Sequence, residues 1–204
     1  QVEHIDWKQG KVTYDNLFEK PVSGMDFNHL SLVNMLVKAD SFYYCNSKVD
    51  VRIKNAQFQE KSGLTVEQLA GRFVMDSTKI QLPDIYLRTP VSNMQATVDM
   101  DLNAFAEKNP GKLTLSLDGK LGRSDLMLFA ADYLPYKMQR KWPYYPLSVK
   151  TSLTGNLSRM SLSALQLSLP TAFQVDANGM LENLRNIDLL KAQVHFRANT
   201  YHLG

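Results

Sequence analysis

Strict alternation of apolar and polar residues recurs along this chain and limits the folds open to it. The segment Met94–Leu102 reads M-Q-A-T-V-D-M-D-L, and the same period of two returns at Leu113–Leu121, Leu147–Leu153, Phe173–Ala177 and Ala192–Ala198. Successive side chains of a β-strand point to opposite faces of its sheet, so each segment has one apolar and one polar face. The pattern predicts a mainly β protein with one large apolar surface.

The earlier part of the chain is less regular. Short strands are expected at Val12–Tyr14 and Leu30–Leu36, and a bulge at Asn55, where the alternation changes phase. Pro83 and Pro90 should lie at strand ends or on an edge strand, because proline cannot donate a hydrogen bond to a sheet.

Residues 123–146 interrupt the strands with a helical pattern. Ser124 is suited to a helix N-cap and Asp125 to a first helical turn. Apolar residues then follow at helical spacing up to Pro135, namely Leu126, Phe129, Tyr133 and Leu134. This segment predicts one or two short helices.

The chain also resembles itself on either side of these helices. Leu69–Phe73 and Leu153–Leu157 each carry a central glycine, and each is followed by a strand that ends at a proline, Pro90 or Pro170. We therefore expect one domain, residues 1–204, with two repeats at about 49–122 and 147–204 joined by the helical segment 123–146. Repeats of one supersecondary unit favour an elongated, stacked architecture.

Composition excludes several classes of protein. The net charge is only +3, so the chain lacks the strong positive field expected of a nucleic-acid-binding protein. Cys45 is the single cysteine, which excludes a disulfide within the chain, and we expect a buried thiol there. No apolar run is long enough to span a membrane. Because the chain begins at Gln1 rather than methionine, we expect it to be part of a longer protein.

The pattern alone leaves three architectures open. About ten to thirteen strands are expected, and a sheet of that size curls, splits or closes. It could form a sandwich, a closed barrel, or a curled sheet whose apolar groove is partly covered by a helix. Burying an exposed Leu or Met contributes about 1.5–3 kcal/mol. An uncovered apolar groove is therefore expected to hold acyl chains, to lie under a lid or to meet another module.

Several stretches resemble the AsmA-like superfamily, and most of all its TamB (translocation and assembly module) branch. The resemblance runs from about Gly24 to His202, and its motifs are diffuse strand patterns rather than catalytic signatures. The stretches that carry it are Gly24–Leu30, Phe58–Thr65 with Leu69, Ile80–Pro90, Leu153–Leu157 and Leu165–Pro170.

The resemblance implies a long curled antiparallel sheet, a β-taco, groove or open half-barrel with one or two short helices. It implies a periplasmic protein of Gram-negative bacteria, anchored to the inner membrane through a segment outside this chain. Its apolar groove would carry or shield phospholipid acyl chains and support outer-membrane biogenesis. The implied partners are phospholipid, neighbouring repeats of the same chain, and an outer-membrane barrel assembly protein that acts through regions outside this chain.

Candidate lipid-groove residues are the apolar members of the alternating strands. Under this hypothesis they contact acyl chains, and under the simpler alternative they form an ordinary protein core. They are Phe73, Met94, Val98, Met100, Leu113, Leu115, Leu117, Leu147, Val149, Leu153, Phe173, Val175, Val194 and Phe196.

The segment Tyr136–Pro146 mixes cations with aromatic residues, a composition typical of membrane interfaces. The alternative is the end of a helix that runs into a proline-bounded loop. The membrane-interface candidates are Lys137, Arg140, Lys141, Trp142, Tyr144 and Tyr145.

No catalytic or cofactor motif is recognisable in the sequence. The histidines His4, His29, His195 and His202 do not stand at metal-ligand spacing with Cys, Asp or Glu. Nucleophile-elbow, P-loop and dinucleotide fingerprints are missing as well. We therefore expect neither an enzyme nor a cofactor, metal or nucleic-acid site. The alternative to a lipid groove is a structural or interaction β-sandwich module of a cell-envelope protein with no lipid ligand.

Overall fold

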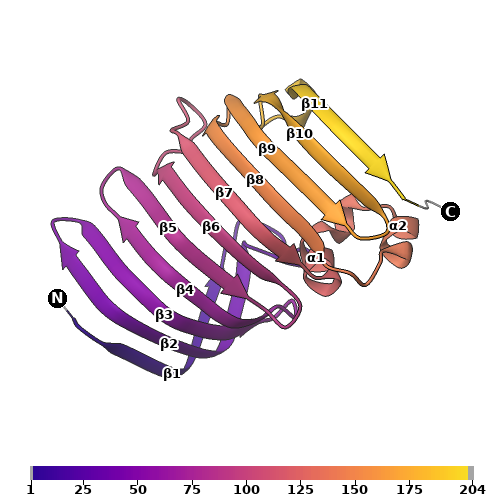
Figure 1. The fold of residues 1–204 in the computed structure, drawn as a ribbon. Helices are drawn as coiled ribbons and strands as arrows, with labels where there is room; N and C mark the ends of the chain where they lie inside the picture. The colour runs from indigo at the N-terminus through magenta and orange to yellow at the C-terminus, as the bar shows by residue number, and fades with distance from the viewer. Residues whose placement is uncertain (1, 202–204) are drawn as a thin grey trace.

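A single antiparallel sheet of eleven strands makes up most of the protein, in a computed structural model that describes residues 2–201 (Figure 1). His202, the last residue of the family resemblance, lies outside these residues. The strands follow one another in chain order, β1 to β11, so every strand pairs with its neighbours in sequence. The mainly β fold predicted from the alternation is confirmed, and so is the antiparallel sheet that the family resemblance implies.

The strands are long, so the sheet is tall along the strands as well as broad across them. Most strands have nine to thirteen residues, and β2 has 17. Their bounds are β1 (Ile5–Asp15), β2 (His29–Cys45), β3 (Lys48–Glu60), β4 (Thr65–Met75), β5 (Lys79–Arg88), β6 (Asn93–Asp101), β7 (Leu113–Leu121), β8 (Leu147–Asn156), β9 (Arg159–Leu169), β10 (Phe173–Glu182) and β11 (Lys191–Thr200).

The short strands expected at 12–14 and 30–36 are wrong in length, because both belong to much longer strands, β1 and β2. Their pairing shifts register near Gly10, and Gln9 and Asn34 both adopt positive φ. A bulge inserts an unpaired residue and reverses the face of every side chain beyond it. The alternation of apolar and polar residues is therefore interrupted along β1 and β2, and the sequence pattern indicates only part of each strand.

Two further predictions concern bulges and prolines. The bulge at Asn55 is confirmed, because the pairing of β3 with β4 shifts register between Ile53 and Ala56. The placement of Pro83 is wrong: it lies inside β5, where the pairing with β6 shifts register between Leu82 and Ile85. Where the register shifts, regular hydrogen bonding between the two strands is interrupted. A proline, which has no N–H group to donate, is therefore tolerated at this position.

Helices occur between β7 and β8, as the helical pattern predicts. They are α1 (Arg123–Ala130), the 3₁₀ turn η1 (Ala131–Tyr133) and α2 (Tyr136–Lys141), while a second 3₁₀ turn, η2 (Ile187–Leu189), precedes β11. The N-cap of α1 is Gly122 rather than Ser124, and Asp125 lies in the first turn as expected.

A small hydrophobic core lies where these helices meet the sheet. Leu126 of α1 and Trp142 pack on Leu147 of β8 and Leu169 of β9. The Trp142 indole meets the Phe173 ring edge to face, with 6.2 Å between ring centroids. The helices therefore cover one face of the sheet at the ends of β7 to β10.

The sheet curls around that same face. The loop between β1 and β2 reaches α1, where the Met25 amide donates a hydrogen bond to the Leu128 carbonyl at 3.0 Å. The rings of Phe27 and Phe129 stack beside it, with 6.4 Å between centroids. Because α1 lies on β7 to β10, this contact brings the first strands of the sheet towards the later ones. The end of β1 and the beginning of β2 turn behind the middle of the sheet (Figure 1). The sheet does not close on itself, since β1 and β11 are its two edges.

The two glycines aligned by the predicted repeat adopt the same backbone conformation. Gly71 has φ of 142° and Gly155 of 147°. A Cβ at either position would lie within 2.4 Å of a neighbouring strand's carbonyl oxygen, Asp84 or Arg159. Only glycine adopts this positive φ readily and leaves room for the carbonyl oxygen. The sheet continues unbroken from β7 to β8, so the repeats remain a prediction about sequence rather than a division of the fold.

The described protein is less compact than an ordinary globular chain of its size. Its accessible surface is 13593 Å². A folded monomer of 23.2 kDa is expected to expose about 9,700 Å². Among the described residues no second sheet packs on the first, so the sandwich alternative does not apply within this part of the chain. The excess reflects a sheet that is one layer thick over most of its breadth.

Candidate functional site

The strand register places the fourteen lipid-groove candidates on one face of the sheet, which we call the apolar face. Residues directly opposite each other in an antiparallel pair lie on the same side. Leu115 of β7, for example, stands opposite Val98 of β6 and Leu153 of β8. Val149 of β8 is linked through β9 to Val175 of β10. The sequence pattern and the pairing thus agree on which side of each strand is apolar.

The apolar face contains further residues that the sequence analysis did not select. On β5 they lie on either side of Pro83, and on β9 the pairing shifts register near Ala164, so the simple alternation fails on both strands. On both strands the leucines change from even-numbered to odd-numbered positions, or the reverse, partway along the strand. This change of phase in the sequence could have identified the residues. These residues are Ile80, Leu82, Leu87, Leu162, Leu165, Leu167 and Leu181.

Burial differs sharply along the apolar face. Leu147 is buried under the helices, with 7% of its surface exposed. Phe196 on the edge strand β11 is 73% exposed, and Val194 is also exposed. The other candidates are half-buried, and two of them, Val149 and Phe173, pack against the core under the helices. The face is therefore partly exposed away from the helices and most exposed on β11.

A buried hydrogen-bond cluster anchors the helices to the sheet. The hydroxyls of Thr89 and Ser92, in the turn between β5 and β6, both donate to the Asp125 carboxylate of α1. The Gly122 amide donates to the Ser92 hydroxyl at 2.9 Å. All three side chains are at least 94% buried. This cluster fixes the start of α1 over the ends of β5 to β7 and so determines how far the helical cover extends.

The loop that meets α1 is itself held by a buried pair. His29 Nδ1 lies 2.9 Å from an oxygen of Asp26, and the amides of Val22 and Asn28 donate to the same carboxylate. The hydrogen bond from the Val22 amide is the largest influence holding the pKa of Asp26 below its ordinary value. These contacts give the loop a defined shape.

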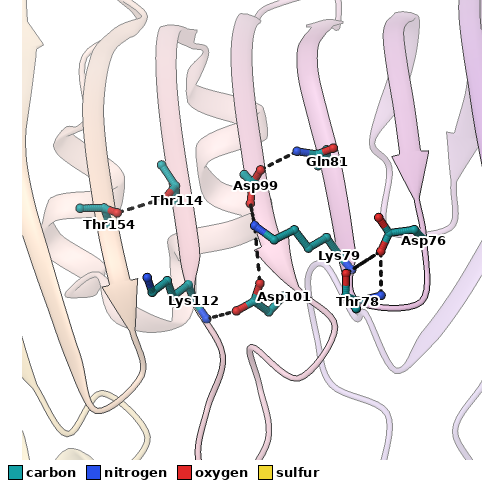
Figure 2. Close-up of polar contacts among 9 residues, drawn as sticks. All are labelled: Asp76, Thr78, Lys79, Gln81, Asp99, Asp101, Lys112, Thr114 and Thr154. Atoms are coloured by element: carbon teal, nitrogen blue, oxygen red, sulfur yellow. Dashed lines mark hydrogen bonds and ion pairs between the residues drawn. The ribbon is translucent and has the colours of Figure 1, made fainter.

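The opposite face of the sheet is polar and satisfies its side chains across strands (Figure 2). The Gln81 amide donates to Asp99 at 2.7 Å, and Lys79 forms ion pairs with Asp99 and Asp101. Further along, the hydroxyls of Thr114 and Thr154 lie 3.0 Å apart. A shallow hollow of about 420 Å³ lies on this face over β6 to β10. Such pairs stabilise neighbouring strands and leave the face well solvated.

Several carboxylates of this polar face have pKa values below their ordinary range. The Arg72 guanidinium donates to Asp50 at 2.6 Å and lowers the pKa of that carboxyl. The Gln81 amide lowers the pKa of Asp99, and the Thr78 amide lowers that of Asp76. A depressed pKa means that the folded state favours the ionised group, so this stability is present above the unfolded pKa and is lost as the pH falls through the folded value.

We therefore expect the urea midpoint of unfolding to fall as the pH drops below about 4, where unfolded aspartates begin to protonate. Asp99→Asn keeps an acceptor for Gln81 and removes the titrating group. The variant should show a weaker dependence of the midpoint on pH, measured by circular dichroism across the acid range. An identical pH slope in the variant and the parent would contradict this assignment.

The membrane-interface candidates separate into two groups. Trp142 is buried, with 9% of its surface exposed, and belongs to the core under the helices. The prediction that it lies at a membrane interface is therefore wrong. The other candidates, Lys137, Arg140, Lys141, Tyr144 and Tyr145, are exposed. Arg123 lies over the Tyr144 ring at 5.6 Å, which joins this segment to α1.

Cysteine, metal-ligand and helix features of residues 2–201 bear on three further predictions. Cys45 is a free, exposed thiol at the end of β2, so the expectation of a buried thiol is wrong. In the described chain, groups of three or more His, Cys, Asp or Glu side chains placed to hold a metal ion are not found. Within the same residues, none of the helices has the length and hydropathy needed to cross a bilayer.

Comparison with known proteins adds no relative. No protein-family model matches the chain, and the searches of curated proteins and of solved structures give no match either. The likeness to the AsmA-like superfamily therefore rests on the sequence stretches alone.

Proposed function

We propose that this chain is a segment of a periplasmic protein, anchored to the inner membrane, whose apolar sheet face carries or shields lipid acyl chains and so supports outer-membrane biogenesis. The observation that carries the proposal is the apolar face, which spans the sheet in a single layer and, among residues 2–201, is covered by helices at one end. The family, location and transport role are inferred from the AsmA-like and TamB-like stretches.

The chemistry of the apolar face suits hydrocarbon. It is formed by Leu, Val, Met and Phe side chains, and thioether and aliphatic groups adapt to partners without hydrogen-bond geometry. Polar groups on it are few, and Thr151 satisfies its hydroxyl on the Ala164 carbonyl at 3.1 Å. Every 100 Å² of this face removed from water contributes about 2.5 kcal/mol. An acyl chain would supply that cover without requiring a fixed orientation.

The dimensions of the sheet also suit hydrocarbon chains. Eleven strands at about 4.8 Å spacing extend roughly 48 Å across the sheet. One leaflet of a bilayer has a hydrocarbon depth of about 15 Å, half that of the whole core. The apolar face is therefore long enough for several acyl chains in succession.

A cross-linking experiment tests this proposal at two adjacent positions of β7. The side chain of Leu117 lies on the apolar face, and that of Ser116 lies on the polar face. A photoreactive benzoylphenylalanine is introduced at either position, the protein is irradiated with palmitate, and the adduct is measured by mass spectrometry. We expect palmitate adducts from position 117 and none above background from position 116.

The outcome separates lipid binding from a purely structural role. Equal labelling at both positions, or labelling at neither, would overturn the proposal and favour a structural module whose apolar face is covered by another protein. Lipid extraction from the purified chain provides a second measurement, and co-purified phospholipid is the expected result.

A further inference from the structure

Exposed apolar side chains gather along the side of the sheet that carries the helices. We call this surface the helical edge and define it as residues 16–28 and 123–146. Phe18 and Leu17, in the loop between β1 and β2, are 97% and 91% exposed, and Tyr144 is 90% exposed. The other large exposed apolar or aromatic residues of the helical edge are Val22, Phe27, Phe129, Tyr133, Tyr136, Met138 and Tyr145.

Direct contacts join the two segments of the helical edge. Phe27 stacks on Phe129, and the Met25 amide donates to the carbonyl of Leu128. Arg123 of α1 lies over Tyr144 and also donates to the Gln139 carbonyl of α2 at 3.0 Å. The exposed residues thus lie on two segments that pack on each other although they are about a hundred residues apart in sequence.

The charges of the helical edge are predominantly positive. Its cations are Arg123 and the exposed Lys20, Lys137, Arg140 and Lys141. Two of its four acids, Asp26 and Asp125, are buried and accept hydrogen bonds within the protein, which leaves Glu19 and Asp132 exposed. On the polar face of the sheet, Lys54, Arg72 and Lys150 each pair with a carboxylate of the neighbouring strand. The helical edge therefore combines exposed apolar and aromatic side chains with an excess of exposed cations over exposed acids.

We propose that the helical edge docks on the surface of an anionic lipid bilayer. This inference rests on the proposed function, since it identifies where the apolar face would meet its source or acceptor of lipid. Leu17 and Phe18 would enter the boundary between headgroups and acyl chains. The tyrosine rings would lie at headgroup depth with their hydroxyls hydrated, and the lysine and arginine head groups would reach the lipid phosphates.

The combination of residues favours a bilayer over a folded protein partner. Aromatic residues, Met and Arg occur at protein–protein interfaces as well, but Lys is depleted from them, and three of the five cations here are Lys20, Lys137 and Lys141. Tyrosines beside Lys and Arg are typical of membrane interfaces. Each Lys or Arg near an anionic surface strengthens binding about five-fold. The helical edge also adjoins the core beneath the helices, through Trp142 and Leu147, so a docked bilayer would lie next to the covered end of the apolar face.

Vesicle flotation of the whole chain tests the docking surface. The probes are phosphatidylcholine vesicles with and without phosphatidylglycerol, at low and at high salt. We expect binding to the anionic vesicles, much weaker binding to the neutral ones, and loss of binding at high salt. Replacing both Leu17 and Phe18 by serine should weaken binding at least about tenfold, because two apolar side chains no longer leave water.

Phe105 supplies a matched control. It is 61% exposed and lies in the loop between β6 and β7, at the strand ends opposite the helices. Phe105→Ser should leave vesicle binding unchanged. Equal weakening by Phe105→Ser, equal binding to neutral vesicles, or no binding at all would overturn the inference. If palmitate still cross-links at position 117 in that case, only the docking surface fails, whereas loss of both would remove the proposed function as well.

Discussion

Trp142→Ala should lower the free energy of unfolding by about 3–5 kcal/mol, the range expected when a buried Trp is truncated. Trp142 packs with Leu126, Leu147 and Leu169, and its ring meets Phe173 edge to face. These contacts form the small core that holds the helices on the sheet. Because the protein has few fully buried apolar residues elsewhere, the surrounding structure cannot compensate for the loss. Urea denaturation followed by circular dichroism measures the change.

Trp142→Phe is the matched control for this prediction. The indole Nε1 is buried, and in the described part of the chain it has no hydrogen-bond partner. Phenylalanine retains an aromatic ring and removes this unpaired N–H group, so we expect the variant to stay within about 1.5 kcal/mol of the parent. A loss as large as that of Trp142→Ala would contradict the packing argument. A loss below about 1 kcal/mol in Trp142→Ala would show that the helices are held by other contacts.

The second large effect concerns ligand binding at the apolar face. Leu115 of β7 and Leu153 of β8 stand opposite each other on this face. Replacing both by glutamine should weaken palmitate binding at least about tenfold, because each leucine contributes about 1.5–3 kcal/mol when it leaves water. Glutamine is neutral, so the change does not alter attraction to the fatty-acid carboxylate. Isothermal titration calorimetry with palmitate gives the affinity.

Ser116 and Ser152 provide the control on the same two strands. They also stand opposite each other, one residue along from the leucines, on the polar face. The double replacement of these serines by glutamine should leave palmitate binding unchanged while adding the same side chains to the sheet. Circular dichroism and the urea midpoint establish that both variants are folded. Equal weakening by the two double variants would mean that palmitate does not bind on the apolar face.

Local sequence was sufficient for the strands and for the two faces of the sheet. On β6, β7 and β8 the period of two is unbroken, so the apolar side of each strand follows from its residues alone. The same reasoning failed at Pro83, which lies in a register shift within β5, and on β1 and β2, where bulges reverse the pattern. A bulge depends on pairing with the neighbouring strand, which a single segment does not record.

The exposure of the candidate residues was beyond local reasoning. Trp142 stands among cations and tyrosines in the sequence, which suggested an interface, yet it is buried because β8, β9 and α1 supply its neighbours. The carboxylate of Asp125 fits a first helical turn, but its partners Thr89 and Ser92 lie more than thirty residues earlier. Such contacts are fixed only when the chain returns to the same point in space.

The sequence by itself determined a mainly β chain with one apolar and one polar face, because successive side chains on a strand must alternate. Only the tertiary structure decided that the sheet curls, that it remains one layer thick, and that helices cover the apolar face at one end alone. Those properties depend on contacts such as Met25 with Leu128, about a hundred residues apart. Their free energy comes from packing between distant segments rather than from the local pattern.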